Sequence, residues 1–238
     1  MRRIGRVAGA RGLAALLAGA AAMPAPAAAQ EARTEYSMTF SEQRPGSRSA
    51  MRINIVYRSP GNRRAKPPAL RAVLLELPQG TTLRGARLPA CQATDADFRL
   101  LGRGACPGET RIGQGTLTAI TGFGFPVDPF HTDVVIYNVP GGFAEVVFMP
   151  GSNTVLALDR AEVSGTEARL APPETPGGPP DGRTAVRRID LSFSPRYALT
   201  PVGCPKDARW HSRGTFDFAD GTTVSDGAST PCVDHRAG

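Results

Sequence analysis

The sequence predicts an all-β fold, in which two antiparallel sheets pack as an immunoglobulin-like or jelly-roll-like β-sandwich with roughly ten strands and little helix. Two observations support this prediction. Apolar and polar residues alternate over short segments, which is typical of half-buried strands. The 238 residues also include 27 glycines and 22 prolines but only 6% aromatic residues, a composition that suits short strands joined by turns.

Three strands are predicted in the first half of the chain. Segment 52–58 alternates with a period of two, and the denser apolar run 72–77 fits the interior of a sandwich. Segment 110–121 alternates again, and its Gly113 and Gly115 are candidates for β-bulges.

The middle of the chain predicts a meander of closely spaced antiparallel strands. Three short β-rich segments cover 134–139, 144–149 and 154–158. The intervening residues, 140–142 and 150–153, are rich in proline, glycine and other turn formers.

The remaining elements are a loop, a strand, a hairpin and one helix. Segment 171–183 contains prolines and glycines and no core-forming residue, so we expect a long connection or a hinge. A strand follows at 188–194, and a hairpin is expected at 215–224 with an Asp-Gly turn at 220–221. A single short helix is expected at 94–101.

The first 29 residues indicate a cleavable export signal. A region with four arginines precedes an apolar stretch that is shorter than the roughly 20 residues needed to span a bilayer. An Ala-x-Ala cleavage pattern then ends before Gln30, which leaves 30–238 as a single domain. Because the signal holds four of the 28 basic residues and none of the 21 acidic ones, cleavage lowers the formal net charge from +7 to +3. The residual charge gives little support for a nucleic-acid partner.

Catalytic and cofactor motifs are not evident in the sequence. It has three histidines and no G-x-S-x-G motif, so no Ser-His-Asp site is predicted. No C-x-x-C pair indicates zinc or thiol redox chemistry, and no cofactor is expected. Asp128, His131 and Asp133 could ligate a divalent cation, but we favour their interpretation as water-facing residues of a loop before a strand.

Three phenylalanines are concentrated in one segment that resembles a loop, at Phe123, Phe125 and Phe130. If they are exposed, they would form a platform for sugar rings or for a protein partner. If they are packed, they would plug the end of the sandwich, which is the interpretation that we favour.

Four cysteines follow the signal, and the sequence allows three pairings of Cys91, Cys106, Cys204 and Cys232. The stretches around them resemble a family of uncharacterised secreted proteins of actinobacteria. The resemblance is carried by Leu77–Gly80, Cys91, Ala105–Pro107, Ile112–Gly115, Gly203–Pro205, Trp210, Phe216–Phe218, Asp220-Gly221 and Pro231-Cys232. It implies a β-sandwich with disulfides between neighbouring cysteines, Cys91 with Cys106 and Cys204 with Cys232. A hairpin between the last two cysteines would also bring them together.

These features predict an exported, non-enzymatic structural or interaction module that is secreted or held at the cell surface. The alternative is a module that binds cell-wall glycan or a small ligand, and the third hypothesis is a secreted hydrolase. Candidate partners are a glycan or a protein of the cell envelope, with no membrane span after cleavage. A histidine beside a buried carboxylate in a cleft would favour the enzyme, whereas exposed phenylalanines would favour the binding module.

Overall fold

The structure is a computed structural model that describes residues 33–233. The predicted signal at 1–29 lies outside these residues. The strands are β1 (Thr34–Phe40), β2 (Arg48–Tyr57), β3 (Leu70–Glu76), β4 (Thr82–Leu83), β5 (Arg111–Ile120), β6 (Phe130–Val139), β7 (Gly142–Phe148), β8 (Val155–Ser164), β9 (Glu167–Leu170), β10 (Ala185–Leu199), β11 (Arg209–Phe218) and β12 (Thr223–Pro231). The helices are α1 (Asp95–Leu101) and the short 3-10 turns η1 (Gly85–Arg87), η2 (Gly102–Ala105) and η3 (Gly108–Thr110).

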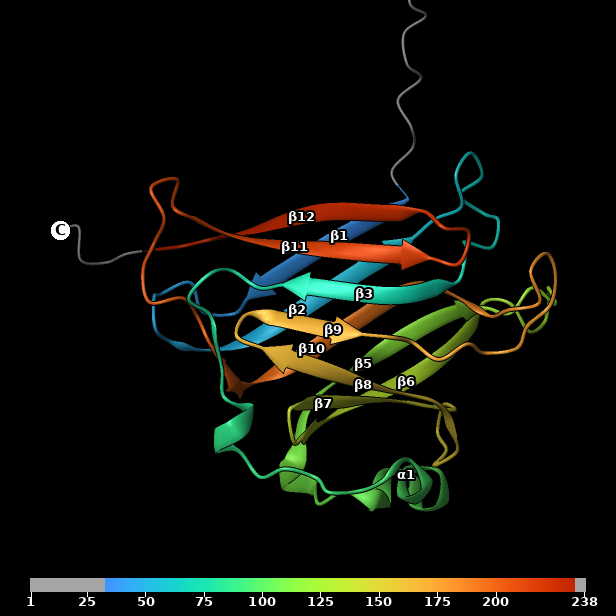
Figure 1. Cartoon of the computed structure of the whole chain (residues 1–238), viewed down its shortest axis with the longest axis horizontal. Helices are drawn as coiled ribbons and strands as arrows, with labels where there is room; N and C mark the ends of the chain where they lie inside the picture. Colours follow the sequence, from blue (N-terminus) through green and yellow to red (C-terminus); the bar gives the residue numbers. More distant parts are fainter. Residues whose placement is uncertain (1–32, 234–238) are drawn as a thin grey trace, which may run out of the picture. The chain divides into compact units, whose positions relative to one another are not determined.

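All of these strands belong to one antiparallel sheet that curls into a barrel-like shape (Figure 1). The order is β1-β2-β10-β5-β6-β7-β8-β9-β3-β11-β12, and β4 pairs with β10. The two edge strands, β1 and β12, are joined through side chains instead of a backbone ladder. Asp226 accepts a hydrogen bond from the Tyr36 N–H at 2.9 Å, and the Thr230 hydroxyl donates to the Met38 carbonyl at 2.8 Å. These contacts cover edges that would otherwise be exposed.

The all-β, antiparallel prediction is confirmed, but the two-sheet sandwich is wrong. A sandwich requires a break in strand pairing between its sheets, and here the long strand β10 pairs with β2 on one side and with β5 and β4 elsewhere. Its register shifts between Phe193 and Ala198, which allows the strand to bend while it keeps its partners. On the opposite side, the four-residue strand β9 joins β8 to β3 and completes the sheet.

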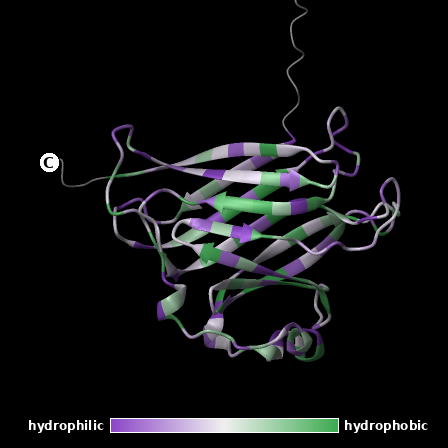
Figure 2. Cartoon of the chain, viewed as in Figure 1, coloured by the Kyte–Doolittle hydropathy of each residue, from purple (hydrophilic) through white to green (hydrophobic). Residues whose placement is uncertain are grey.

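Hydrophobic and hydrophilic residues alternate along the strands, as the banding in Figure 2 shows. In β2 the inward side chains run from Met51 to Tyr57 at every second position and are all buried. The bulge expected in β5 is present, because the register with β6 shifts between Arg111 and Gly113. Gly115 is required by packing, since a Cβ there would lie 1.9 Å from the Asp190 carbonyl oxygen.

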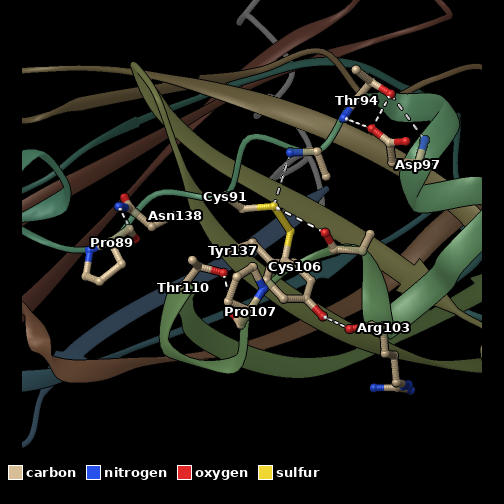
Figure 3. The surroundings of a disulfide bond; sticks show 12 residues. Pro89, Cys91, Thr94, Asp97, Arg103, Cys106, Pro107, Thr110, Tyr137 and Asn138 are labelled. Carbon is tan, nitrogen blue, oxygen red and sulfur yellow. Dashed lines mark hydrogen bonds between the residues drawn. A yellow bond between two sulfur atoms is a disulfide. The ribbon is translucent and has the colours of Figure 1, made fainter.

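The outer face of β6, β7 and β8 is covered by the segment that contains α1. Phe98 of this helix is fully buried and packs on Tyr137 with a ring separation of 5.6 Å. The helix lies where it was predicted, and it begins with a reciprocal cap between Thr94 and Asp97. The Cys91–Cys106 disulfide closes the segment beneath the helix, as Figure 3 shows.

Candidate functional site

The interior of the barrel contains a cavity of about 350 Å³. About eight strands give a barrel that side chains just fill, and the diameter grows with the number of strands, so this wider sheet leaves space inside. Residues of nine strands, β2 to β10, line the cavity. Its lining is mostly aliphatic and aromatic, and it includes Met51, Ile53, Ile55, Leu75, Leu117, Phe143, Val147, Ala157, Ala168, Leu170, Ile189, Leu191 and Phe193.

The rest of the interior, beneath β1, β11 and β12, is filled by aromatic rings. Phe216 packs edge-to-face on Tyr57 with 5.5 Å between ring centroids, and Trp210 packs in the same way on Phe40 at 5.7 Å. The indole N–H of Trp210 donates to the Gly203 carbonyl at 2.9 Å. This aromatic packing confines the cavity to the other half of the barrel.

One end of the cavity is bordered by loops. The strand ends at Phe130 and Thr121 meet the segment 172–176 there, together with the exposed Leu156. This segment belongs to the predicted proline-rich loop, which connects β9 to β10 and lies at the end of the barrel. The loop is therefore part of the candidate site, and the hinge between half-domains that we considered is not observed.

Lys66 holds this loop in place, and its side chain is only 6% exposed. Its ammonium group donates to the Asp181 carboxylate at 2.6 Å and to the Gly178 carbonyl at 3.0 Å. Partial burial acts to raise the pKa of the Asp181 carboxyl, but the hydrogen bond and charge of Lys66 and backbone N–H groups outweigh it, so the pKa is lowered. The loop is thus held by a charged anchor beside the open end of the cavity.

Two acidic side chains lie on the inner face of the sheet. Glu145 of β7 stands directly opposite Asp159 of β8, a position in which Cβ atoms are about 5 Å apart. Phe143 and Val147 flank Glu145 on the same face, and both belong to the interior core. An acidic pair is therefore placed within an otherwise apolar surface.

Burial raises the pKa of both carboxyls in this pair, and the nearness of Asp159 adds to the shift at Glu145. The pKa of Glu145 is raised to about 7, first because burial disfavours its charge and second because Asp159 is nearby. The pKa of Asp159 is also raised by burial, although backbone N–H groups of Arg160 and Ala171 oppose the shift. Two phenols complete the titratable lining, Tyr57 and Tyr197, and burial raises both of their pKa values.

Two buried polar atoms of the cavity wall have no hydrogen-bond partner within residues 33–233, the Tyr57 hydroxyl oxygen and Oδ2 of Asp159. Glu145 is only 8% exposed, and over the same residues its carboxyl forms no hydrogen bond or ion pair. Lysine, arginine and histidine do not occur among the described residues that line the cavity. The site therefore offers hydrogen-bond acceptors with no protein donor to satisfy them.

The predicted phenylalanine group is divided between the surface and the cavity. Phe123 and Phe125 are 67% and 93% exposed, so the expectation that they plug the fold is wrong for these two residues. Phe130 is half-buried and lines the cavity.

The candidate metal ligands are not brought together. Asp128 accepts hydrogen bonds from the backbone N–H groups of Thr121, Gly122 and Gly124, which organise the loop. Asp133 pairs with Arg103 at 2.9 Å, and the His131 ring contacts the Thr118 hydroxyl at 3.1 Å. Their interactions are those of loop and strand residues. In the part of the chain that the structure describes, groups of three potential ligands do not occur.

The described histidines, His131 and His211, do not line the cavity. His211 pairs with Asp207 at 2.6 Å, but both side chains are more than half exposed on the outer surface. His235 lies outside the described residues. The arrangement that would favour an enzyme, a histidine beside a buried carboxylate, does not occur within 33–233.

Both predicted disulfides are formed. Cys91 pairs with Cys106 and Cys204 with Cys232, with Cα separations of 5.4 and 5.6 Å. Trp210 belongs to the same core cluster as Cys232. Over the described residues, no helix has the length and apolar character needed to cross a membrane.

No family model and no curated protein matches the chain. Among solved structures, the T6 backbone pilin of serotype M6 Streptococcus pyogenes is similar, with 9% sequence identity and a TM-score of 0.36. The similarity covers 83% of this chain and 35% of the pilin chain, so the chain spans only a part of the pilin's length. At this level the similarity carries no argument about function. The resemblance to secreted actinobacterial proteins stays a prediction.

Proposed function

We propose that this protein is an exported, non-enzymatic module that binds a small amphipathic molecule inside its barrel. The observation that carries the proposal is the apolar cavity of about 350 Å³ with an acidic pair in its wall. Small-molecule sites typically have volumes of roughly 300–1,000 Å³ and combine apolar walls with a few polar groups. The cavity has this composition.

A purely structural or interaction module, the leading hypothesis from the sequence, remains the competing explanation. Such a module gains nothing from this interior, because a cavity and buried unpaired carboxyls both lower stability. Buried groups with perturbed pKa values in a cavity instead favour a functional site. The exposure of Phe123 and Phe125 also favours a binding module over a closed structural domain.

The export part of the proposal is supported by the two disulfides, which persist mainly in oxidising compartments. Protein recovered from outside the cytoplasm should begin at or within a few residues of Gln30. Mass spectrometry of its N-terminus tests this, and an intact Met1 would contradict it.

Binding in the cavity is tested with prodan, a small neutral dye whose emission shifts to the blue in apolar surroundings. We expect saturable binding to the wild type. The variant Leu117→Trp should lose it, because this inward side chain lines the cavity and the larger ring would occupy the space.

The matched control is Thr116→Trp, which adds the same ring at the neighbouring exposed position of β5. It should bind prodan like the wild type. Equal binding by both variants would place the dye on the surface, and absence of binding to the wild type would refute the proposed function.

A further inference from the structure

We propose that the occupant of the cavity is an amphipathic amine, whose ammonium group lies between Glu145 and Asp159 while its apolar part fills the rest of the barrel interior. This inference rests on the proposed function and names its ligand class. It follows from the charges, the unpartnered atoms and the shape of the lining.

The charge of the lining discriminates between ligand classes. The two carboxyls face the cavity without a basic side chain among the described lining residues. An anionic ligand would bring a further negative charge to the pair, and a neutral one would leave the pair uncompensated. A cation would relieve the repulsion between the carboxyls and form charge-assisted hydrogen bonds with them.

The hydrogen-bonding capacity of the site matches an ammonium group. Primary ammonium has three N–H donors and no acceptor. The wall provides three acceptors without a protein partner: the Glu145 carboxyl, Asp159 Oδ2 and the Tyr57 hydroxyl. Tyr57 is 1% exposed, and it lines the same cavity as Glu145, whose charge contributes to raising the pKa of the Tyr57 phenol. Tyr57 is therefore an independent indication of a ligand beside the acidic pair.

The neighbours of the pair suit an apolar chain. Ala157 and Ala161 flank Asp159 on β8, and Ala168 follows on β9, so small side chains leave space beside the carboxyls. Phe143, Val147 and Leu191 provide apolar contact surface around it. The same cavity is also lined by Pro172 and Pro173 at the loop-bordered end.

Release of a proton on binding would distinguish an amine from a neutral ligand. Near pH 6 Glu145 is mostly protonated, and binding of an ammonium group requires loss of that proton to the buffer. Above the Glu145 pKa of about 7 the carboxylate is already formed. The affinity for an amine should therefore rise by about tenfold from pH 6 to pH 8, and the affinity for a neutral ligand should not. Asp159, Tyr57 and Tyr197 also face the cavity, and neither tyrosine ionises in this range.

Isothermal titration with octylamine and 1-octanol tests the inference, because the two probes differ only in their polar group. At pH 8 the wild type should bind octylamine more tightly than 1-octanol. At pH 6 octylamine binding should release a proton, which is detected by titration in buffers of different ionisation enthalpy. Glu145→Gln should lose the preference and the pH dependence while it still binds 1-octanol. Glu162→Gln, which removes an exposed carboxylate from the outer face of β8, is the matched control and should behave like the wild type.

The outcomes separate the two proposals. If 1-octanol binds but octylamine shows no preference or no pH dependence, the amine inference is overturned and the cavity remains a binding site. If octylamine binding is unchanged in Glu145→Gln, the amine does not use the acidic pair and the inference is also overturned. If neither probe binds, the proposed function itself fails.

Discussion

Replacing Glu145 with glutamine should remove a pH dependence of stability. In the folded state the Glu145 carboxyl has a pKa of about 7, whereas in the unfolded chain it titrates near 4.5. Between these values the native state holds more protons than the unfolded state, so stability falls as pH rises. Because a tenfold change in an ionisation constant corresponds to about 1.4 kcal/mol, the total loss is about 3 kcal/mol, most of it between pH 5 and pH 7.

Urea denaturation at pH 5 and pH 8 measures this loss, with the disulfides intact and the buried Trp210, the only tryptophan of the chain, as the fluorescent probe. Glu145→Gln should be nearly as stable as the wild type at pH 5 and clearly more stable at pH 8. The pH dependence of stability that remains in this variant is expected to come from Asp159. The Glu162→Gln control should keep the pH dependence of the wild type. Identical slopes for the wild type and Glu145→Gln would refute the assignment of a buried, protonatable Glu145.

Three further predictions concern the framework around the cavity. Replacing both Cys204 and Cys232 with alanine should lower the free energy of unfolding by about 3 kcal/mol in urea titrations, because the unfolded chain gains conformational freedom. An unchanged midpoint would show that the disulfide does not stabilise the fold. Lys66→Met should accelerate cleavage of the turn at 178–181 by a protease of broad specificity, because the ammonium anchor is lost, and a cleavage rate equal to the wild type would count against the anchor. Phe125→Ser should change the free energy of unfolding by less than about 0.5 kcal/mol, because the ring is almost fully exposed; a loss of several times that amount in the same titration would place the ring in a packed site.

The individual strands were largely predictable because their signals are local. Segment 52–58 alternates with a period of two, and the structure forms β2 there. The hairpin predicted at 215–224 is formed by the ends of β11 and β12, and Gly221 adopts the positive φ of 83° that its turn requires. Composition and turn residues are sufficient for such elements.

The closure of the sheet was not predictable, because it depends on contacts between distant segments. The strand β1 was not predicted, although its buried residues Tyr36, Met38 and Phe40 alternate with exposed polar ones. The strand β9 has only four residues, too few for a periodic pattern. In the structure, β1 lies beside β12, and β9 joins β8 to β3. Without these two strands, the sequence favoured two separate sheets.

The cavity site was missed for a related reason. The sequence Phe143–Phe148 shows one acidic residue, Glu145, within an apolar β-rich run, and this was the only local signal of a buried carboxyl. Its partner Asp159 becomes relevant only through the β7–β8 register. The disulfide pairs could be predicted, because each connects neighbouring cysteines around a local unit.

The most direct measurement of the central claim is an isotope-filtered nuclear Overhauser experiment between unlabelled octylamine and protein with labelled methyl groups. The account predicts contacts from the alkyl chain to Val147, Leu117 and Leu191, which line the cavity. Contacts confined to exposed side chains such as Leu100 and Val202 would contradict binding inside the barrel.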